Sequence, residues 1–225
     1  MKKEEKSKWS CNNDPLDIGI GYVRKQREYG ALDNKEYFHY FPELPTYFTH
    51  PLSKAPSELK KLINVADKIF NDSIKVSQLA LKEIEKGKQG AFERFFPHGS
   101  TRPGSGILRF LKYHPTTRGR HIAQGHYDKS GLTLALAESK PGLRIGFDEK
   151  DMRLVEHKSG FALTFPGIKF TKLTDGVIRP SWHEAVELDE KPYRPDCSRW
   201  AIVFFLHPEG IETASFEDHH RPLTK

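Results

Sequence analysis

The chain has 225 residues, of which 36% are hydrophobic, and its formal net charge is +6. This length suits one sizeable domain, and no apolar run is long enough to cross a bilayer or to follow the basic N-terminus as a secretory signal would. We therefore expect a soluble, cytoplasmic protein that forms one structural unit.

The positive charge raises nucleic acid as a partner, but the composition disfavours it. Lysines and arginines are mixed with acidic residues throughout, and the aromatic residues do not alternate with basic ones as they do in a base-stacking surface. Cys11 and Cys197 lie far apart and lack metal-type spacing, so we expect two reduced thiols.

Residues 1–100 are predicted to form an irregular and helical region that packs on the core. Residues 1–52 are rich in aromatics, and the prolines among them prevent long regular elements. From Ser57, a candidate N-cap, apolar residues recur at helical spacing as far as Gly87, and the opposite face is rich in Lys and Glu. This pattern predicts one long amphipathic helix.

Residues 101–225 are predicted to form a β-rich core. Short apolar runs are separated by turn residues and have no helical pattern between them, which is typical of a sandwich or a barrel. The predicted strands are 106–114, 131–138, 142–147, 152–157, 161–165, 182–188 and 199–207. The expected fold is therefore α+β and mainly β, with a helical layer on an antiparallel sandwich.

A His-x-Asp triplet, His126 and Asp128, stands before one of the most apolar runs. Residues two apart in a strand point to the same face, so both side chains would project together. With His183 from a late strand they would form the two-histidine, one-carboxylate set that suits Fe(II) and leaves coordination positions open. Alternatively, Asp128 caps the turn at 129–131 and His126 is an ordinary edge residue; such a set could also hold a hydrolytic zinc.

Arg199 opens a strongly apolar strand, where an arginine is costly to bury without an anionic partner. Its same-face neighbour Ala201 leaves space beside the guanidinium, which would suit the carboxylate of a small molecule. The alternative is an ion pair with a protein acid such as Asp196 or Glu187.

Three segments carry a resemblance to a known family. The segments "LRFLKYHP", "GHYDKSGLTLALAESKPGLRI" and "FALTFPGIKFTKLTDG" are similar to the isopenicillin N synthase-like branch of the iron- and 2-oxoglutarate-dependent dioxygenases, and the likeness extends over residues 21–207. The resemblance implies a double-stranded β-helix, or jelly roll, with Fe(II) held by His126, Asp128 and His183. It also implies 2-oxoglutarate and O2 as cosubstrates.

The resemblance further implies that Arg199 binds the distal carboxylate of 2-oxoglutarate, with Tyr113 and Ala201 beside the cosubstrate. The implied reaction is hydroxylation or desaturation of a small soluble metabolite, with release of succinate and CO2. The N-terminal aromatic region and the neighbour of the distal histidine fall where relatives contact substrate. The expected substrate-pocket residues are Tyr22, Arg24 and Trp182, and the same region includes Tyr37, Phe38, His39 and Phe41.

The sequence departs from the family pattern at three positions. Ala201 replaces a hydroxyl-bearing residue, Leu111 replaces an asparagine, and Glu184 replaces an arginine. Two alternatives therefore stay open: an Fe(II)/O2 oxidase of the same fold that does not use 2-oxoglutarate, and a non-catalytic jelly-roll module that binds a metal or a metabolite.

Overall fold

A computed structural model describes most of the chain. The described residues are 1–10, 19–25, 33–86, 90–97, 106–115, 119–188, 198–212 and 215. Cys11 and Cys197 lie outside these ranges, so the structure does not address their predicted redox state.

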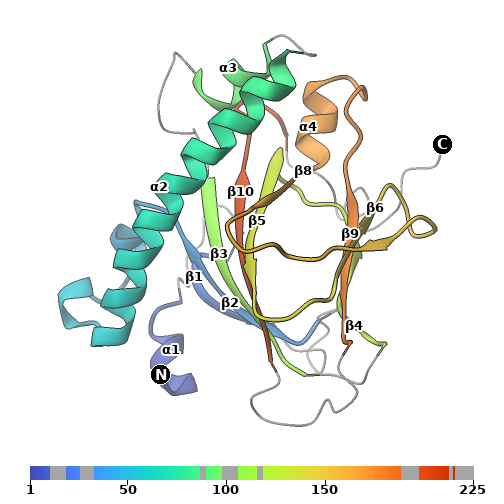
Figure 1. Ribbon diagram of the computed structural model, residues 1–225. Coiled ribbons are helices and arrows are strands. Elements are labelled where there is room, and N and C mark those ends of the chain that lie inside the picture. The colour runs from blue at the N-terminus through green and yellow to red at the C-terminus, as the bar shows by residue number, and fades with distance from the viewer. Residues whose placement is uncertain are drawn as a thin grey trace.

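Two antiparallel sheets face each other (Figure 1). The larger sheet has the order β1-β2-β3-β10-β5-β8 and the smaller one the order β4-β9-β6-β7. The strands are β1 (Gly21–Lys25), β2 (Lys35–Tyr40), β3 (Gly106–Tyr113), β4 (His121–His126), β5 (Leu132–Glu138), β6 (Leu143–Gly146), β7 (Arg153–Leu154), β8 (Leu163–Pro166), β9 (Trp182–Val186) and β10 (Arg199–Leu206). This arrangement confirms the predicted jelly roll.

Short helical segments surround the sheets, and one helix is long. They are α1 (Lys3–Ser7), η2 (Leu44–Tyr47), η3 (Leu52–Lys54), α2 (Ser57–Glu85), α3 (Ala91–Phe95) and α4 (Ile168–Leu173). None of the helices in the described ranges is both long enough and apolar enough to cross a membrane.

The long helix α2 confirms the helical periodicity of the sequence. It lies along the outer face of the larger sheet (Figure 1), and its buried stripe includes Leu59, Ile63 and Phe70. The Phe70 ring meets the Phe204 ring of β10 edge to face, with 5.3 Å between centroids. Each such fully buried side chain contributes about 1.5–3 kcal/mol to folding. The N-cap, however, is Pro56, so the prediction that Ser57 caps the helix is wrong.

The N-terminal region contributes strands as well as helices, in contrast to the irregular structure expected for residues 1–52. β2 pairs with β3, and β1 extends the sheet beyond β2. Successive side chains of β2 point to opposite faces of the sheet: His39 stands beside Arg109 on one face, and Phe38 stands beside Phe110 on the other. One face of β2 therefore turns toward the smaller sheet and the other toward α2.

Candidate metal centre and cavity

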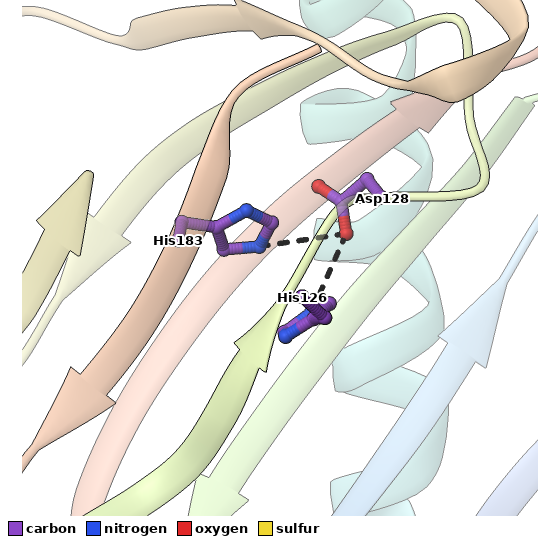
Figure 2. A group of neighbouring side chains, drawn as sticks. All are labelled: His126, Asp128 and His183. Carbon is purple, nitrogen blue, oxygen red and sulfur yellow. Dashed lines mark ion pairs between the residues drawn. The ribbon is translucent and has the colours of Figure 1, made fainter. Parts of the chain in front are cut away.

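Three predicted metal ligands converge between the two sheets. The candidate ligand atoms of His126, Asp128 and His183 all lie within 4.8 Å of one another. The Oδ1 atom of Asp128 is 3.7 Å from Nε2 of His126 and 3.6 Å from Nε2 of His183. Figure 2 shows both imidazoles turned toward this carboxylate. Two imidazole nitrogens and one carboxylate oxygen form the donor set that suits Fe(II).

The register of β4 and β9 explains how ligands so distant in sequence meet. His126 and His183 are direct partners across this antiparallel pair. Asp128 differs from the expectation, because β4 ends at His126 and the aspartate follows the strand rather than belonging to it. Its carboxylate nevertheless reaches the same face, where it is 7% exposed.

Hydrogen bonds orient each of the three side chains. Nδ1 of His126 lies 2.7 Å from the carbonyl oxygen of Gln124, and Nδ1 of His183 lies 3.2 Å from that of Ser181. Donation from Nδ1 leaves each Nε2 as the metal-binding lone pair. Thr133 Oγ1 donates to Asp128 Oδ2 at 2.7 Å, so the other carboxylate oxygen, Oδ1, is directed at the histidines. These contacts prepare the site for a cation.

A cavity of about 270 Å³ opens from the triad into the space between the sheets. Its walls include all three predicted cosubstrate residues, Tyr113, Arg199 and Ala201. The guanidinium of Arg199 lies 5.8 Å from the centre of the Tyr113 ring, and Arg199 is 5% exposed. The structure thus brings the predicted metal ligands and the predicted cosubstrate residues to one cavity.

The two groups of residues occupy different depths of this cavity. Nε of Arg199 lies near Gly142, and Gly142 in turn packs against the backbone carbonyl of Val186. Val186 is three residues beyond His183 on β9, which corresponds to about 10 Å at the usual rise per residue of a strand. Arg199 therefore closes the end of the cavity that lies away from the triad.

An acidic residue that the sequence analysis did not single out pairs with Arg199. Glu138 Oε2 accepts a short hydrogen bond from a terminal nitrogen of Arg199, while Arg199 Nε donates to the Lys140 carbonyl at 3.3 Å. Of the acids considered as partners, Glu187 instead binds the Lys140 ammonium at 3.0 Å, and Asp196 lies outside the described residues.

A β-bulge accounts for the inward position of Glu138. On β5, Thr133 and Ala135 face Phe205 and Val203, but the register shifts between Val203 and Ile202, and Glu138 then stands opposite Ala201. Strict alternation from Thr133 would have placed Glu138 on the outer face. The sequence carried no clear signal of this bulge.

A second arginine of the cavity wall, Arg109, was also missed. It precedes Leu111 and Tyr113 on the inner face of β3, so the alternation of the "LRFLKYHP" strand could have identified it. Near it lies His207, whose pKa burial lowers to about 4; the positive charges of Lys169 and Arg109 also lower it, against the effect of Asp128. His207 is therefore neutral at pH 7.

The three expected substrate-pocket residues do not line this cavity. Tyr22 stands opposite Phe38 and Arg24 opposite Glu36, so both are on the outer face of the larger sheet. Trp182 directly precedes His183 in β9 and points the other way, packing its ring against that of Tyr127 with centroids 4.9 Å apart.

Tyr22 has a structural role on that outer face. Its hydroxyl donates to Glu36 at 2.7 Å, and the Lys6 ammonium lies 3.0 Å from the same carboxylate. Burial alone would raise the pKa of Glu36, but the bonds from Tyr22 and Lys6, together with the charge of Lys112, lower it to about 2. Burial and the bond to Glu36 raise the pKa of Tyr22.

Comparison with known proteins agrees with the fold. The sequence model of the 2OG-Fe(II) oxygenase superfamily matches residues 105–208. Protein DOWNY MILDEW RESISTANCE 6 of Arabidopsis thaliana is 22% identical over 219 residues, which are 96% of this chain and 53% of that protein. The chain thus spans about half the length of this curated relative.

Solved structures share the architecture. A full-length Neurospora crassa protein, solved in complex with alpha-KG, superposes with a TM-score of 0.68 at 19% identity, over 98% of this chain and 74% of that one. AtDAO1, the dioxygenase for auxin oxidation 1 of Arabidopsis thaliana, solved as its 2-oxoglutarate binary complex, gives a TM-score of 0.67 at 16% identity, over 95% and 75% of the two chains. The His-Asp-His centre and the strands β3 to β10 of the double-stranded β-helix thus lie within residues 105–208, the part of the chain that matches the sequence model of the 2OG-Fe(II) oxygenase superfamily.

Proposed function

We propose that this protein is an Fe(II)- and 2-oxoglutarate-dependent oxygenase that hydroxylates or desaturates a small soluble metabolite. In the hydroxylation, substrate, O2 and 2-oxoglutarate would give hydroxylated substrate, succinate and CO2. The observation that carries the proposal is the convergence of His126, Asp128 and His183 on a cavity that ends at Arg199. The likeness to the Neurospora crassa protein in complex with alpha-KG and to the AtDAO1 binary complex supports the cosubstrate.

The protein would hold the metal from one side. His126 and His183 would each donate Nε2, and Asp128 would donate Oδ1, because the opposite atoms of all three side chains already have hydrogen-bond partners. The iron, when bound, supplies the redox chemistry that activates O2. The chain supplies the geometry, and the apolar walls of the cavity keep water away from the reacting atoms.

The far end of the cavity would receive the distal carboxylate of 2-oxoglutarate. Arg199 offers a planar fork suited to two parallel hydrogen bonds, and Tyr113 lies beside it. Ala201, opposite Leu111 in the register, leaves room for the cosubstrate chain. To bind this carboxylate through both terminal nitrogens, Arg199 must release Glu138 from one of them.

That last requirement favours a second candidate, an Fe(II)/O2 oxidase that does not use 2-oxoglutarate. The Arg199 charge is already neutralised by Glu138. Ala201 and Leu111 also offer no polar group to a cosubstrate. In this case the triad would function with O2 and substrate alone.

An anaerobic titration separates the candidates. Metal-free protein would receive Fe(II) and then 2-oxoglutarate while the visible charge-transfer band of the chelate is recorded. We expect a band that is lost in His126→Ala, is strongly weakened in Arg199→Ala and persists in Arg24→Ala, an exposed arginine outside the cavity. Iron binding without any band would favour the oxidase, and absence of iron binding would refute both candidates.

A further inference from the structure

Arg109 is a second guanidinium on the cavity wall, and the proposed reaction gives it no role. It lies at the centre of the larger sheet, opposite His39 on one side and Val203 on the other. It lines the cavity that contains the triad. Within the described ranges, no carboxylate forms an ion pair with it, in contrast to the pairing of Arg199 with Glu138.

One hydrogen bond and two aromatic rings hold the Arg109 side chain. Its Nε donates to Nε2 of the fully buried His39 at 2.6 Å. The guanidinium carbon lies 4.9 Å from the ring centre of Tyr37 and 4.6 Å from that of Phe205, and such positions over aromatic rings are favourable for a cation. His39 accepts a hydrogen bond from Nε of Arg109 alone, so the edge formed by the two terminal nitrogens of Arg109 stays available to a ligand.

The register places Arg109 at the end of the cavity that holds the triad. Phe205, which contacts the guanidinium, stands opposite Thr133, and Thr133 donates to the ligand Asp128. Arg199 lies six residues earlier on β10, at the cosubstrate end. Arg199, which is paired with Glu138, therefore lies at the end of the cavity far from the triad. Arg109, which has no paired acid within the described ranges, lies at the end close to the triad.

We propose that Arg109 is a specificity-determining residue that binds the carboxylate of the substrate. The assignment rests on the proposed function and names its substrate class: a small carboxylic acid whose anion meets the terminal nitrogens of Arg109 while its carbon chain extends toward the triad. A clamped planar fork matches the two oxygens of a carboxylate. The volume of about 270 Å³, shared with the cosubstrate, restricts the acid to a small molecule.

Binding is measured first on the iron-free protein, so that the result does not depend on oxygenase activity. The probes are benzoate, phenylacetate and hexanoate, each compared with its uncharged amide by calorimetry. We expect at least one acid to bind tenfold or more tightly than its amide. This preference should fall to less than twofold in Arg109→Gln and should persist in Arg24→Gln, whose arginine is exposed on the outer face. Circular dichroism of both variants verifies folding.

Several results would overturn the assignment. These are binding of acids and amides with equal affinity, absence of binding by all three acids, tighter binding of phenyl phosphate than of benzoate, and an undiminished acid preference in Arg109→Gln. The charge-transfer titration then distinguishes the two proposals. An unchanged 2-oxoglutarate affinity in Arg109→Gln fits the substrate role, whereas its loss would assign Arg109 to the cosubstrate. If wild type shows no band but still prefers acids, the oxygenase proposal fails and the anion site stands.

Discussion

Replacing Glu138 by Gln should tighten the binding of 2-oxoglutarate. The Glu138 carboxylate binds one of the two terminal nitrogens of Arg199 that the cosubstrate would use, and the two side chains are only 9% and 5% exposed. Binding of 2-oxoglutarate therefore exchanges one carboxylate for another and leaves the displaced one near the incoming charge. Glutamine keeps the shape of the side chain but carries no charge to compete or to repel.

The size of the effect follows from the bond that is exchanged. A hydrogen bond to a charged group contributes about 1.5–3 kcal/mol. Removing that competitor should lower the Kd for 2-oxoglutarate about 10- to 100-fold. The same change should destabilise the ligand-free protein, because Arg199 loses its buried counter-charge, and saturating 2-oxoglutarate should restore the stability.

The assay is the anaerobic titration of the charge-transfer band at saturating Fe(II), combined with urea unfolding with and without 2-oxoglutarate. Glu36→Gln is the matched control, because Glu36 is also a buried acid with cationic partners but lies on the outer face of the sheet. An unchanged or weaker affinity in Glu138→Gln, with iron binding intact, would refute the reasoning and would indicate that Glu138 supports the cosubstrate site.

Three further substitutions test the metal site, a buried ion pair on the outer face of the larger sheet, and the packing behind the metal ligands. Thr133→Val removes the hydrogen bond to Asp128 Oδ2 and should weaken Fe(II) binding about 10- to 100-fold by calorimetry, whereas unaltered affinity would contradict the orienting role. Glu36→Gln should cost about 1–2 kcal/mol at pH 7, after allowance for solvent screening, because the pKa of Glu36 is lowered to about 2. The contribution of Glu36 to the free energy of unfolding is complete above the ordinary pKa of a glutamate and is lost as the pH falls toward 2. Urea unfolding curves of the variant and the wild type should therefore converge between pH 5 and 2. A difference in stability that stays constant over this range would contradict the pKa shift. Gly125→Ala would place a Cβ 2.7 Å from the Trp182 ring and should destabilise the fold by about 1–3 kcal/mol, with partial recovery in Gly125→Ala/Trp182→Phe.

The sequence predicted the elements whose hydrophobic period is regular. The stripe of α2 and the strand runs of the second half are confirmed, although β7 is reduced to Arg153–Leu154 within the predicted 152–157. β2 was missed because it is buried on both faces: Phe38 and Tyr40 turn toward α2, while Tyr37 and His39 turn toward the cavity side. A strand without polar alternation, next to several prolines, cannot be distinguished from an irregular aromatic segment.

The metal ligands could be proposed from the sequence because their types and order are characteristic. Their supporting partners could not be proposed in the same way. The bond from Thr133 to Asp128 depends on the turn after β4, and the inward position of Glu138 depends on a bulge in the β5–β10 pair. Arg109 and His39 meet only because β2 joins the sheet beside β3. Each of these contacts is set by register, which single-residue patterns do not encode.

Register also links the stability of the fold to the geometry of the metal site. His126 and His183 are cross-strand partners, so a slip of one residue between β4 and β9 would turn one imidazole to the opposite face. The outer face opposes such a slip: the Trp182 ring fills the space above Gly125, which has no Cβ, and packs against Tyr127. Trp182 is 1% exposed, so any slip would uncover a large apolar surface. The residue that adjoins the distal histidine therefore serves the site from the opposite face, by fixing where His183 stands relative to His126.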